Sequence, residues 1–194
     1  MSTPSAPTAD AEDRAISPYS TREKFARLLW AFVQTTLFRP SFHNWYAWRS
    51  FLLTRFGARL GTSVRIRRTV RVECPWNLSA GSNCSVGDHA ILYCLGPVTL
   101  GDRVSISQNA HICAGSHDHT RPDLPLTRPP ITIHSDAWIA ADAFVGPGVT
   151  VAEGAILGAR ACAFKDVPPW TIFGGNPARK IADRPPLGNQ GPTP

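Results

Sequence analysis

The chain has 194 residues, enough for one domain with a substantial hydrophobic core and a short extra segment. Apolar residues make up 43% and charged residues 18%, which indicates a globular protein, and 18 prolines with 15 glycines disfavour an all-helical bundle. The net charge of +6 is uneven, because residues 22–71 hold 11 Lys and Arg against the single acid Glu23, whereas residues 72–194 hold 8 against 10. A basic segment therefore precedes a slightly acidic body.

The cysteines and the first residues predict where the protein works. None of the five cysteines forms a CxxC pair, and the stretch MSTPSAPTADAED is polar and acidic where a signal peptide is basic and then apolar. We therefore expect the reducing cytoplasm. The sequence contains no run of 18 apolar residues, so we expect no membrane-spanning helix. No nucleic-acid motif accompanies the basic segment, so we expect no nucleic-acid partner.

Residues 1–20 are rich in Ser, Thr, Pro, Ala and Asp, which predicts a disordered tail. Residues 21–61 form a predicted helical segment. Its first amphipathic helix ends at Pro40, and its apolar positions follow helical spacing: Phe25, Leu28, Leu29, Phe32, Val33 and Leu37.

A second helix in this segment ends near Gly57 or Gly61, and its apolar stripe comprises Trp45, Trp48, Leu52 and Phe56. Two uses of the pair stay open. The apolar stripes can dock onto the rest of the domain or a partner subunit. Residues 22–61 also suit peripheral contact with the inner face of a membrane, because Trp, Phe and Leu beside Lys and Arg fit the headgroup boundary.

From residue 62 a six-residue repeat replaces the helical pattern, and we assign residues 62–181 to it and residues 182–194 to a C-terminal tail. The first position of each repeat is Ile, Leu, Val or Ala, and the fifth is small or β-branched. This period predicts short strands wound into a coil with tight corners, not a helix or a plain strand alternation. Glycine follows the first position in five repeats, where we expect a left-handed backbone. The first positions are Ala80, Val86, Leu92, Leu100, Ile106, Ile112, Ile133, Ile139, Val145, Val151, Leu157 and Ala163.

Residues 118–132 interrupt the repeat and predict a protruding loop. Three histidines lie at or beside its start, His111, His117 and His119. A zinc site needs convergent ligands, and the spacing of these histidines does not provide them, so we expect no metal. A Ser116–His117 acyl-enzyme is also disfavoured, because neighbouring residues of a strand point to opposite sides and no GxSxG elbow is present.

Four stretches together resemble the hexapeptide-repeat acyltransferases, and most of all the colanic-acid biosynthesis acetyltransferases: FRPSFHNWYAWRSFLLTRFGARLG, PWNLSAG, VTLGDRVSISQNAHICAGSHDHT and GVTVAEGAILGARACAFKDVPPWTIFGGNPARKI. The resemblance covers about residues 22–183. It implies a mainly β fold, a left-handed parallel β-helix with three hexapeptides per turn. It also implies a homotrimer that binds acetyl-CoA as co-substrate between subunits and acetylates a sugar hydroxyl in exopolysaccharide biosynthesis, the acceptor being a sugar or a lipid-linked saccharide.

The resemblance also assigns the site. His117 matches the general base, a role that suits histidine because imidazole accepts and returns a proton near neutral pH. The acceptor-binding positions are Tyr93, Cys94, Asp118 and His119. Several relatives have Asn or Ser where this chain has Cys94, which leaves the acceptor open.

The coenzyme-binding positions follow the loop. The resemblance places Trp138 near the acetyl group, the Ala141 amide at the oxyanion, Ala159 in mid-groove, and Phe164, Lys165 and Arg179 along the coenzyme. The alternatives are that these alanines are small because corners require it, and that the cations are solvated surface charges. Two other functions stay open: transfer to an amino sugar or serine, and a non-catalytic β-helical assembly subunit.

Overall fold

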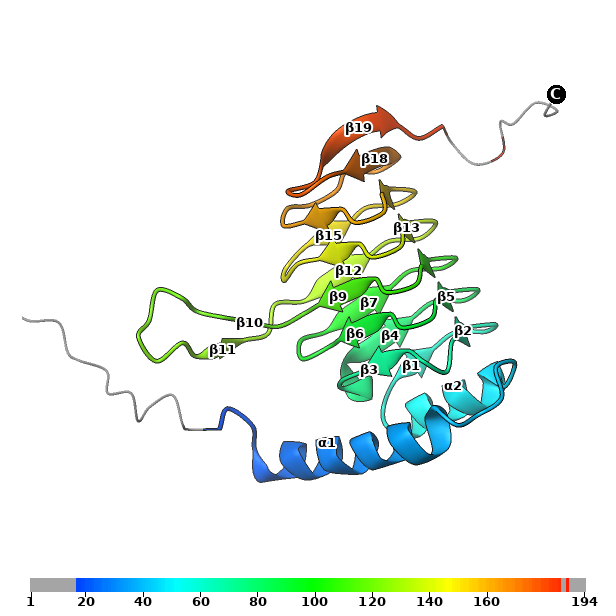
Figure 1. Ribbon diagram of the computed structural model, residues 1–194, viewed down its shortest axis with the longest axis vertical. Helices are drawn as coiled ribbons and strands as arrows, with labels where there is room; N and C mark the ends of the chain where they lie inside the picture. Colours follow the sequence, from blue (N-terminus) through cyan, green and yellow to red (C-terminus); the bar gives the residue numbers. More distant parts are fainter. Residues whose placement is uncertain (1–16, 186–187, 189–194) are drawn as a thin grey trace, which may run out of the picture.

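The computed structural model describes residues 17–185 and residue 188. Most of this chain winds into a stack of coils, with two helices across its N-terminal end and one arm at its side (Figure 1). Residues 1–16 of the predicted N-terminal tail lie outside the described residues. Residues 186–187 and 189–194 of the predicted C-terminal tail do so as well.

Three parallel sheets form the walls of the coil, and they are called sheets A, B and C in chain order. Sheet A contains β1 (Arg59–Leu60), β4 (Leu78–Ala80), β7 (Val98–Leu100), β12 (Ile131–Ile133) and β15 (Thr150–Val151). Sheet B contains β2 (Arg65–Ile66), β5 (Ser85–Val86), β8 (Ser105–Ile106), β13 (Trp138–Ile139), β16 (Ile156–Leu157) and β18 (Thr171–Gly174), with β19 (Arg179–Asp183) antiparallel at its edge. Sheet C contains β3 (Arg71–Val72), β6 (Ile91–Tyr93), β9 (His111–Cys113), β14 (Phe144–Val145) and β17 (Cys162–Ala163).

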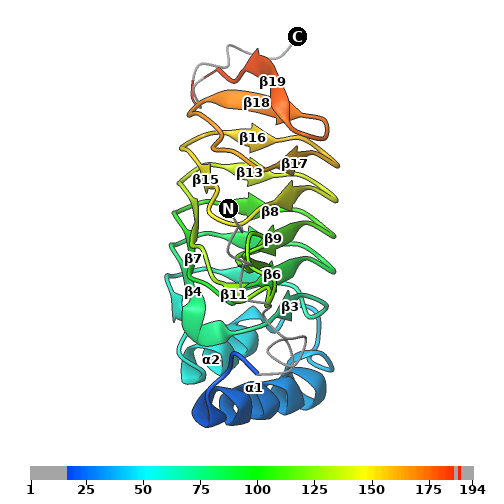
Figure 2. The same ribbon diagram turned by 90° about the vertical axis from the view of Figure 1, so that its left-hand side faces the viewer.

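The chain passes from sheet A to B to C and back to A, so the coil has an A–B, a B–C and a C–A corner. Figure 2 faces the C–A corner, with strands of sheet A on one side and of sheet C on the other. Paired residues lie 20 apart in the coils before the arm, as in Arg59 and Ser79. After the arm they lie 18 apart, as in Thr132 and Thr150, and then 16 apart in the last coil, as in Ile156 and Ile172. The predicted mainly β solenoid is confirmed.

The repeat's apolar positions fill the interior. All twelve predicted first positions are buried. The fifth positions are buried as well, except Ser116, which is exposed because the chain leaves the coil there. One coil precedes the twelve first positions identified in the sequence, since Leu60, Ile66 and Val72 stack under Ala80, Val86 and Leu92. The predicted helical segment therefore stops short of residue 61.

The glycines after the first positions have a different role from the predicted one. The left-handed residues of the corners lie two positions later and include Asn83, with φ of 60°. Gly81 and Gly87 are required by close approach of the next coil instead. A Cβ atom at Gly81 would lie 2.8 Å from the carbonyl carbon of Gly101, and one at Gly87 would lie 2.7 Å from the Gln108 nitrogen.

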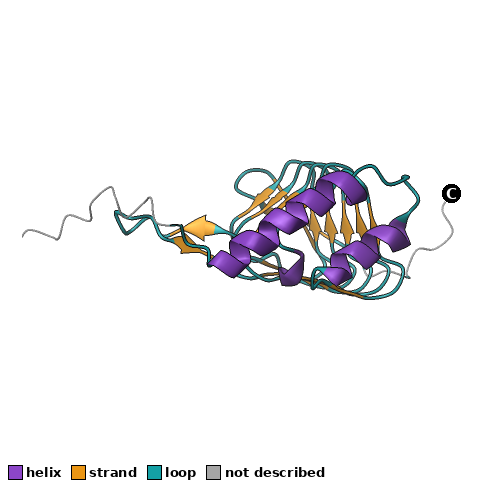
Figure 3. Ribbon diagram, turned by 90° about the horizontal axis from the view of Figure 1, so that it is seen from below, coloured by secondary structure: helices purple, strands orange, loops and turns teal. Residues whose placement is uncertain are grey.

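The helices close the open end of the coil (Figure 3). They are α1 (Thr21–Val33), the π-helical turn η2 (Gln34–Phe38) that continues it, and α2 (Tyr46–Arg55). A short 3₁₀ turn, η3 (Pro75–Asn77), follows β3. Trp30 is buried, and its Nε1 donates to the Val72 carbonyl at 2.7 Å. Arg49 is fully buried and donates to the carbonyls of Ile66, Phe42 and His43 at 2.6 to 2.8 Å.

Only part of each predicted apolar stripe faces the coils. In the first stripe only Val33 is buried, whereas Phe25, Leu28 and Phe32 are each more than 60% exposed. The buried residues Trp30 and Phe38 were not part of the predicted stripe. Within the described residues, no helix has both the length and the apolar content needed to cross a bilayer.

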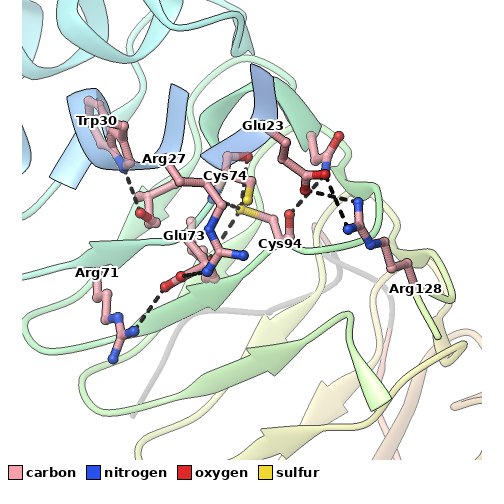
Figure 4. A network of polar contacts seen from close by, with 11 residues as sticks. Glu23, Arg27, Trp30, Arg71, Glu73, Cys74, Cys94 and Arg128 are labelled. Carbon is pink, nitrogen blue, oxygen red and sulfur yellow. Dashed lines mark hydrogen bonds and ion pairs between the residues drawn. The ribbon is translucent and has the colours of Figure 1, made fainter. Parts of the chain in front are cut away.

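The arm leaves the C–A corner after β9 (Figures 1 and 2). It is a hairpin in which β10 (Ser116–His117) pairs antiparallel with β11 (Leu126–Thr127). Arg128, at its returning end, forms an ion pair of 3.0 Å with Glu23 of α1 (Figure 4). This ion pair thus connects the arm to the N-terminal helix.

Candidate active site at the root of the arm

His117 lies on β10, where the arm begins, and its side chain is exposed. Its Nδ1 atom lies 2.6 Å from the carbonyl oxygen of Leu124 across the hairpin. A carbonyl can only accept a hydrogen bond, so Nδ1 carries the proton. In the neutral imidazole, Nε2 then holds a lone pair and can accept a proton from a substrate. The arm therefore fixes the tautomer that a general base requires.

The other polar residues of the arm mainly stabilise the arm. The Asp118 carboxylate accepts from the backbone N–H of Thr120 at 3.0 Å and from its hydroxyl at 2.6 Å, and these bonds hold the pKa of Asp118 below its usual value. Asp118 thus organises the turn, and neither of these hydrogen bonds involves His117. Arg121 pairs with Asp123 at 2.7 Å. His119 is exposed two residues beyond His117.

An aromatic column lies on the outer face of sheet C and begins beside Gly115, two residues before His117. The Tyr93 ring lies against Gly115, because a Cβ added there would be 3.1 Å from the ring. Ring centroids are 6.2 Å apart for Tyr93 and His111, 5.4 Å for His111 and Phe144, and 5.7 Å for Phe144 and Phe164. Sequence analysis did not assign His111 and Phe144 to the site. Their positions before the first residues of two repeats, on adjacent strands, were the available signal.

His111 is held by packing more than by hydrogen bonds. Its Nε2 is buried without a hydrogen-bond partner among the described residues. Burial lowers the pKa of His111, and the positive charge of Arg71 lowers it further. The ring is therefore favoured in its neutral form within the column.

Cys94 lies inside the coil and not on the acceptor side. It is fully buried, and its Sγ donates to the Cys74 carbonyl at 3.2 Å (Figure 4). Burial raises the pKa of Cys94 to about 11. The preceding residue, Tyr93, points outward and is the member of this pair that a ligand can reach, because strand residues alternate between the two faces.

The predicted coenzyme residues divide between two corners. Phe164 and Lys165 follow β17 at the C–A corner, the corner from which the arm and His117 emerge. Ala141 and Ala159 lie at the B–C corner, one coil apart. Within the described residues, neither alanine N–H donates to another backbone group. Both are thus free to donate to a ligand, and Ala141 can serve a developing oxyanion.

Trp138 lies on β13, beside the B–C corner. It is 44% exposed, and its Nε1 donates to the Ser107 hydroxyl at 2.9 Å. It borders an open hollow of about 600 Å³ on the outer face of sheet B, which is also lined by Ser105, Arg65 and Arg103. The guanidinium of Arg103 is engaged by Asp136 through two bonds of 2.7 Å.

Two cations remain available for a phosphorylated ligand. Lys165 and Arg179 are exposed, and neither forms an ion pair with any residue that the structure describes. Arg179 begins β19, and its only side-chain hydrogen bond to a described residue is the one it donates to the carbonyl of Ala178. In residues 17–185 and 188, no three His, Cys, Asp or Glu side chains converge as metal ligands do.

Comparison with known proteins defines the class. No family model matches the chain. The solved structure of a galactoside acetyltransferase in complex with coenzyme A is 24% identical, covers 87% of this chain and 85% of its own, and has a TM-score of 0.79. A hexapeptide-repeat acetyltransferase from Vibrio cholerae, complexed with acetyl coenzyme A, is 22% identical, covers 88% and 93%, and has a TM-score of 0.78. The fold is therefore the left-handed β-helix of the hexapeptide-repeat acetyltransferases.

The sequence comparison narrows the class to a family. A protein of Escherichia coli K12, named as the colanic acid biosynthesis acetyltransferase WcaF, is 44% identical over 156 residues, which are 80% of this chain and 86% of that protein. The chain belongs to the family of colanic acid biosynthesis acetyltransferases. The resemblance seen in the sequence is confirmed.

Proposed function

We propose that this enzyme transfers the acetyl group of acetyl-CoA to a hydroxyl of a sugar used in exopolysaccharide biosynthesis, with His117 as general base. The observation that carries the proposal is the hydrogen bond of 2.6 Å between His117 Nδ1 and the Leu124 carbonyl. It leaves Nε2 as a proton acceptor on an exposed corner. The likeness to WcaF and to acetyl-CoA-binding neighbours supports the choice of coenzyme and pathway.

The chemistry is a direct transfer. Nε2 of His117 takes the proton of the acceptor hydroxyl as its oxygen attacks the thioester carbonyl. The carbonyl oxygen becomes an oxyanion, which the Ala141 N–H stabilises. The intermediate collapses, the carbon–sulfur bond breaks, and the imidazolium returns its proton to the coenzyme thiolate. Phe164 packs on the pantetheine, while Lys165 and Arg179 bind coenzyme phosphates.

The division of the site between two corners supports a homotrimer. In one coil, Ala141 and the next C–A corner are separated by the width of sheet C, about 17 Å at roughly 3.3 Å per residue. One acetyl group cannot reach both corners of the same chain. A neighbouring copy that turns its B–C corner toward the C–A corner of the first completes the site, and repetition of that contact closes a ring.

We place the enzyme in the cytoplasm, with a sugar or a lipid-linked saccharide as acceptor and with residues 22–61 in peripheral contact with the inner membrane face. Tyr93 and His119 flank His117 on the acceptor side, and we assign acceptor contacts to them. Cys94 is left out of the site because its thiol is buried.

A subunit-complementation experiment tests the shared site. His117→Ala removes the base at the C–A corner, and Ala159→Trp blocks the groove at the B–C corner. Each variant alone should be inactive in a thiol-release assay with acetyl-CoA. Mixed and reassembled, the two variants should regain activity, since some sites then combine His117 of one chain with Ala159 of another. Absence of any recovery, or a monomeric mass, would contradict the shared site.

The acceptor is tested with the same assay and a panel of neutral sugars, amino sugars and serine. Turnover with a sugar hydroxyl that disappears in His117→Ala supports the proposal. Turnover with only an amine or serine would redirect it to the alternative acceptors. Binding of acetyl-CoA without turnover on any acceptor, including lipid-linked saccharides, would favour a non-catalytic assembly subunit.

A further inference from the structure

The helical cap carries a large apolar surface that faces away from the coils. Its members, here called the outer apolar face, are between 36% and 70% exposed: Phe25, Leu28, Leu29, Phe32, Leu37, Phe42, Trp45, Trp48 and Phe51. Four of them recur at helical spacing on one side of α1. The face lies on the helices that cross the N-terminal end of the stack (Figure 3).

The face is continuous from one helix to the other. The rings of Phe42 and Trp45 have centroids 5.1 Å apart, and those of Trp48 and Phe51 stack at 5.8 Å. Trp48 also donates to the carbonyl of Leu37 at 3.1 Å, which joins α2 to η2. These contacts hold the aromatic rings in a fixed surface instead of leaving them as separate side chains.

Closing the solenoid does not require this surface. The side of the helices that covers the coil uses other residues, among them Trp30, Phe38 and Leu53. The end cap of a solenoid normally has a polar outer surface, because that surface meets water. Here the outer surface carries nine exposed large apolar side chains, and a large contiguous apolar surface of this kind marks an interaction site.

The charges around the face indicate what covers it. Four exposed cations of the helical segment form no ion pair with any described residue, namely Arg22, Lys24, Arg39 and Arg55. The only acid between residues 22 and 71, Glu23, is already paired with Arg128. A second copy docked on this face would bring two cationic rims together, which is unfavourable. A surface with anionic headgroups over an apolar layer matches both the charge and the rings.

We infer that the outer apolar face docks on a lipid bilayer that contains anionic lipid, with the rings at the headgroup boundary and the cations on lipid phosphates. This inference deepens the proposed membrane contact and rests on it only for the choice of membrane. Because the helices cross the end of the stack, the coils point away from the bilayer (Figure 1). In a trimer with parallel coils, all three faces lie on the same side and bind together.

Vesicle flotation of the full-length protein tests the inference. Vesicles of phosphatidylcholine with about one third phosphatidylglycerol should float the protein, and raised salt should weaken binding, since exposed charges are screened. Phe25→Ser, Leu28→Ser and Phe32→Ser together should reduce binding at least tenfold. These side chains are exposed, so the variant should keep its unfolding temperature. Ile181→Ser is the matched control, because Ile181 is 68% exposed on β19 at the opposite end and should have no effect.

Two further measurements make each outcome decisive. Arg22→Gln, Lys24→Gln and Arg39→Gln together should remove the preference for anionic over neutral vesicles. Flotation unchanged by the triple serine variant would overturn the inference. The inference would also be overturned if the wild type does not float and the triple serine variant has a lower mass in sedimentation than the wild type, because the face would then join copies of the chain. His117→Ala should float like the wild type, so loss of acyl transfer and loss of membrane binding are separable.

Discussion

Replacement of His117 by Asn isolates the chemical role of the imidazole from its structural role in the arm. The Asn side chain keeps an N–H near the position of Nδ1, so it can still donate to the Leu124 carbonyl, but it offers no proton acceptor where Nε2 lies. A positioned general base typically contributes about 10² to 10⁴ in rate. We therefore expect the kcat of His117→Asn to fall by that factor, which corresponds to a rise in the activation free energy of about 2.7 to 5.4 kcal/mol at about 1.36 kcal/mol per decade.

The comparison with His117→Ala measures what the hydrogen bond contributes to the arm. Alanine loses both the base and the bond to Leu124, and a bond of this kind is worth about 0.5 to 1.5 kcal/mol. Both variants should lose the same kcat in the thiol-release assay, and the KM for acetyl-CoA should change little. Only the alanine variant should become more sensitive to limited proteolysis in the arm.

The refuting result is specific. If His117→Asn retains most of the wild-type kcat while His117→Ala loses it, the imidazole serves to hold the arm and another group takes the proton. If both variants are as active as the wild type, His117 is not part of the reaction.

Three further predictions concern stability. Arg49→Met leaves several buried oxygens without their donor and should lower the free energy of unfolding by about 3 to 5 kcal/mol in urea titration, whereas the exposed Arg55→Met should change it little. Burial raises the pKa of Cys94 from 9.0 to about 11, so between these pH values the unfolded chain loses a proton that the folded chain keeps. The free energy of unfolding should therefore fall as the pH rises from about 9 to about 11, and it should fall less in Cys94→Ala. The hydrogen bonds from Arg103 hold the pKa of Asp136 below 3.8, so their stabilisation is present above that pH and is lost as the pH falls through the lowered pKa. Asp136→Asn lacks this contribution, so it should be less stable than the wild type at neutral pH in urea titration, and the difference should shrink as the pH falls below 3.8.

The six-residue period alone predicted the solenoid and its core. A narrow triangular interior admits one apolar and one small residue per side, so the pattern appears directly in the sequence. Residues from 62 onward were assigned to the solenoid, but individual repeats were placed only from Ala80, because the pattern fails at the end of the first coil. Trp76 stands where the fifth position of that repeat would be small, and it lies half-buried in η3 instead of inside the coil.

The helices show what periodicity cannot decide. Both sides of α1 carry large apolar residues, so helical spacing identifies a stripe without saying which stripe is buried. The bond from Trp30 to the Val72 carbonyl and the ion pair between Glu23 and Arg128 fix the rotation of α1 on the coil, and these partners are distant in the sequence. The exposed face that follows is therefore a property of the tertiary structure.

The sequence by itself determined the class of fold, the interruption at residues 118–132 and the histidine at its root. Only the tertiary structure decided how the site residues group. Cys94 turned inward because the alternation of a strand places it opposite Tyr93, and His117 acquired its tautomer from a carbonyl seven residues away across the hairpin. The hydrogen-bonded register between coils, with paired residues 20 apart before the arm and 18 or 16 apart after it, shows which corner each residue occupies.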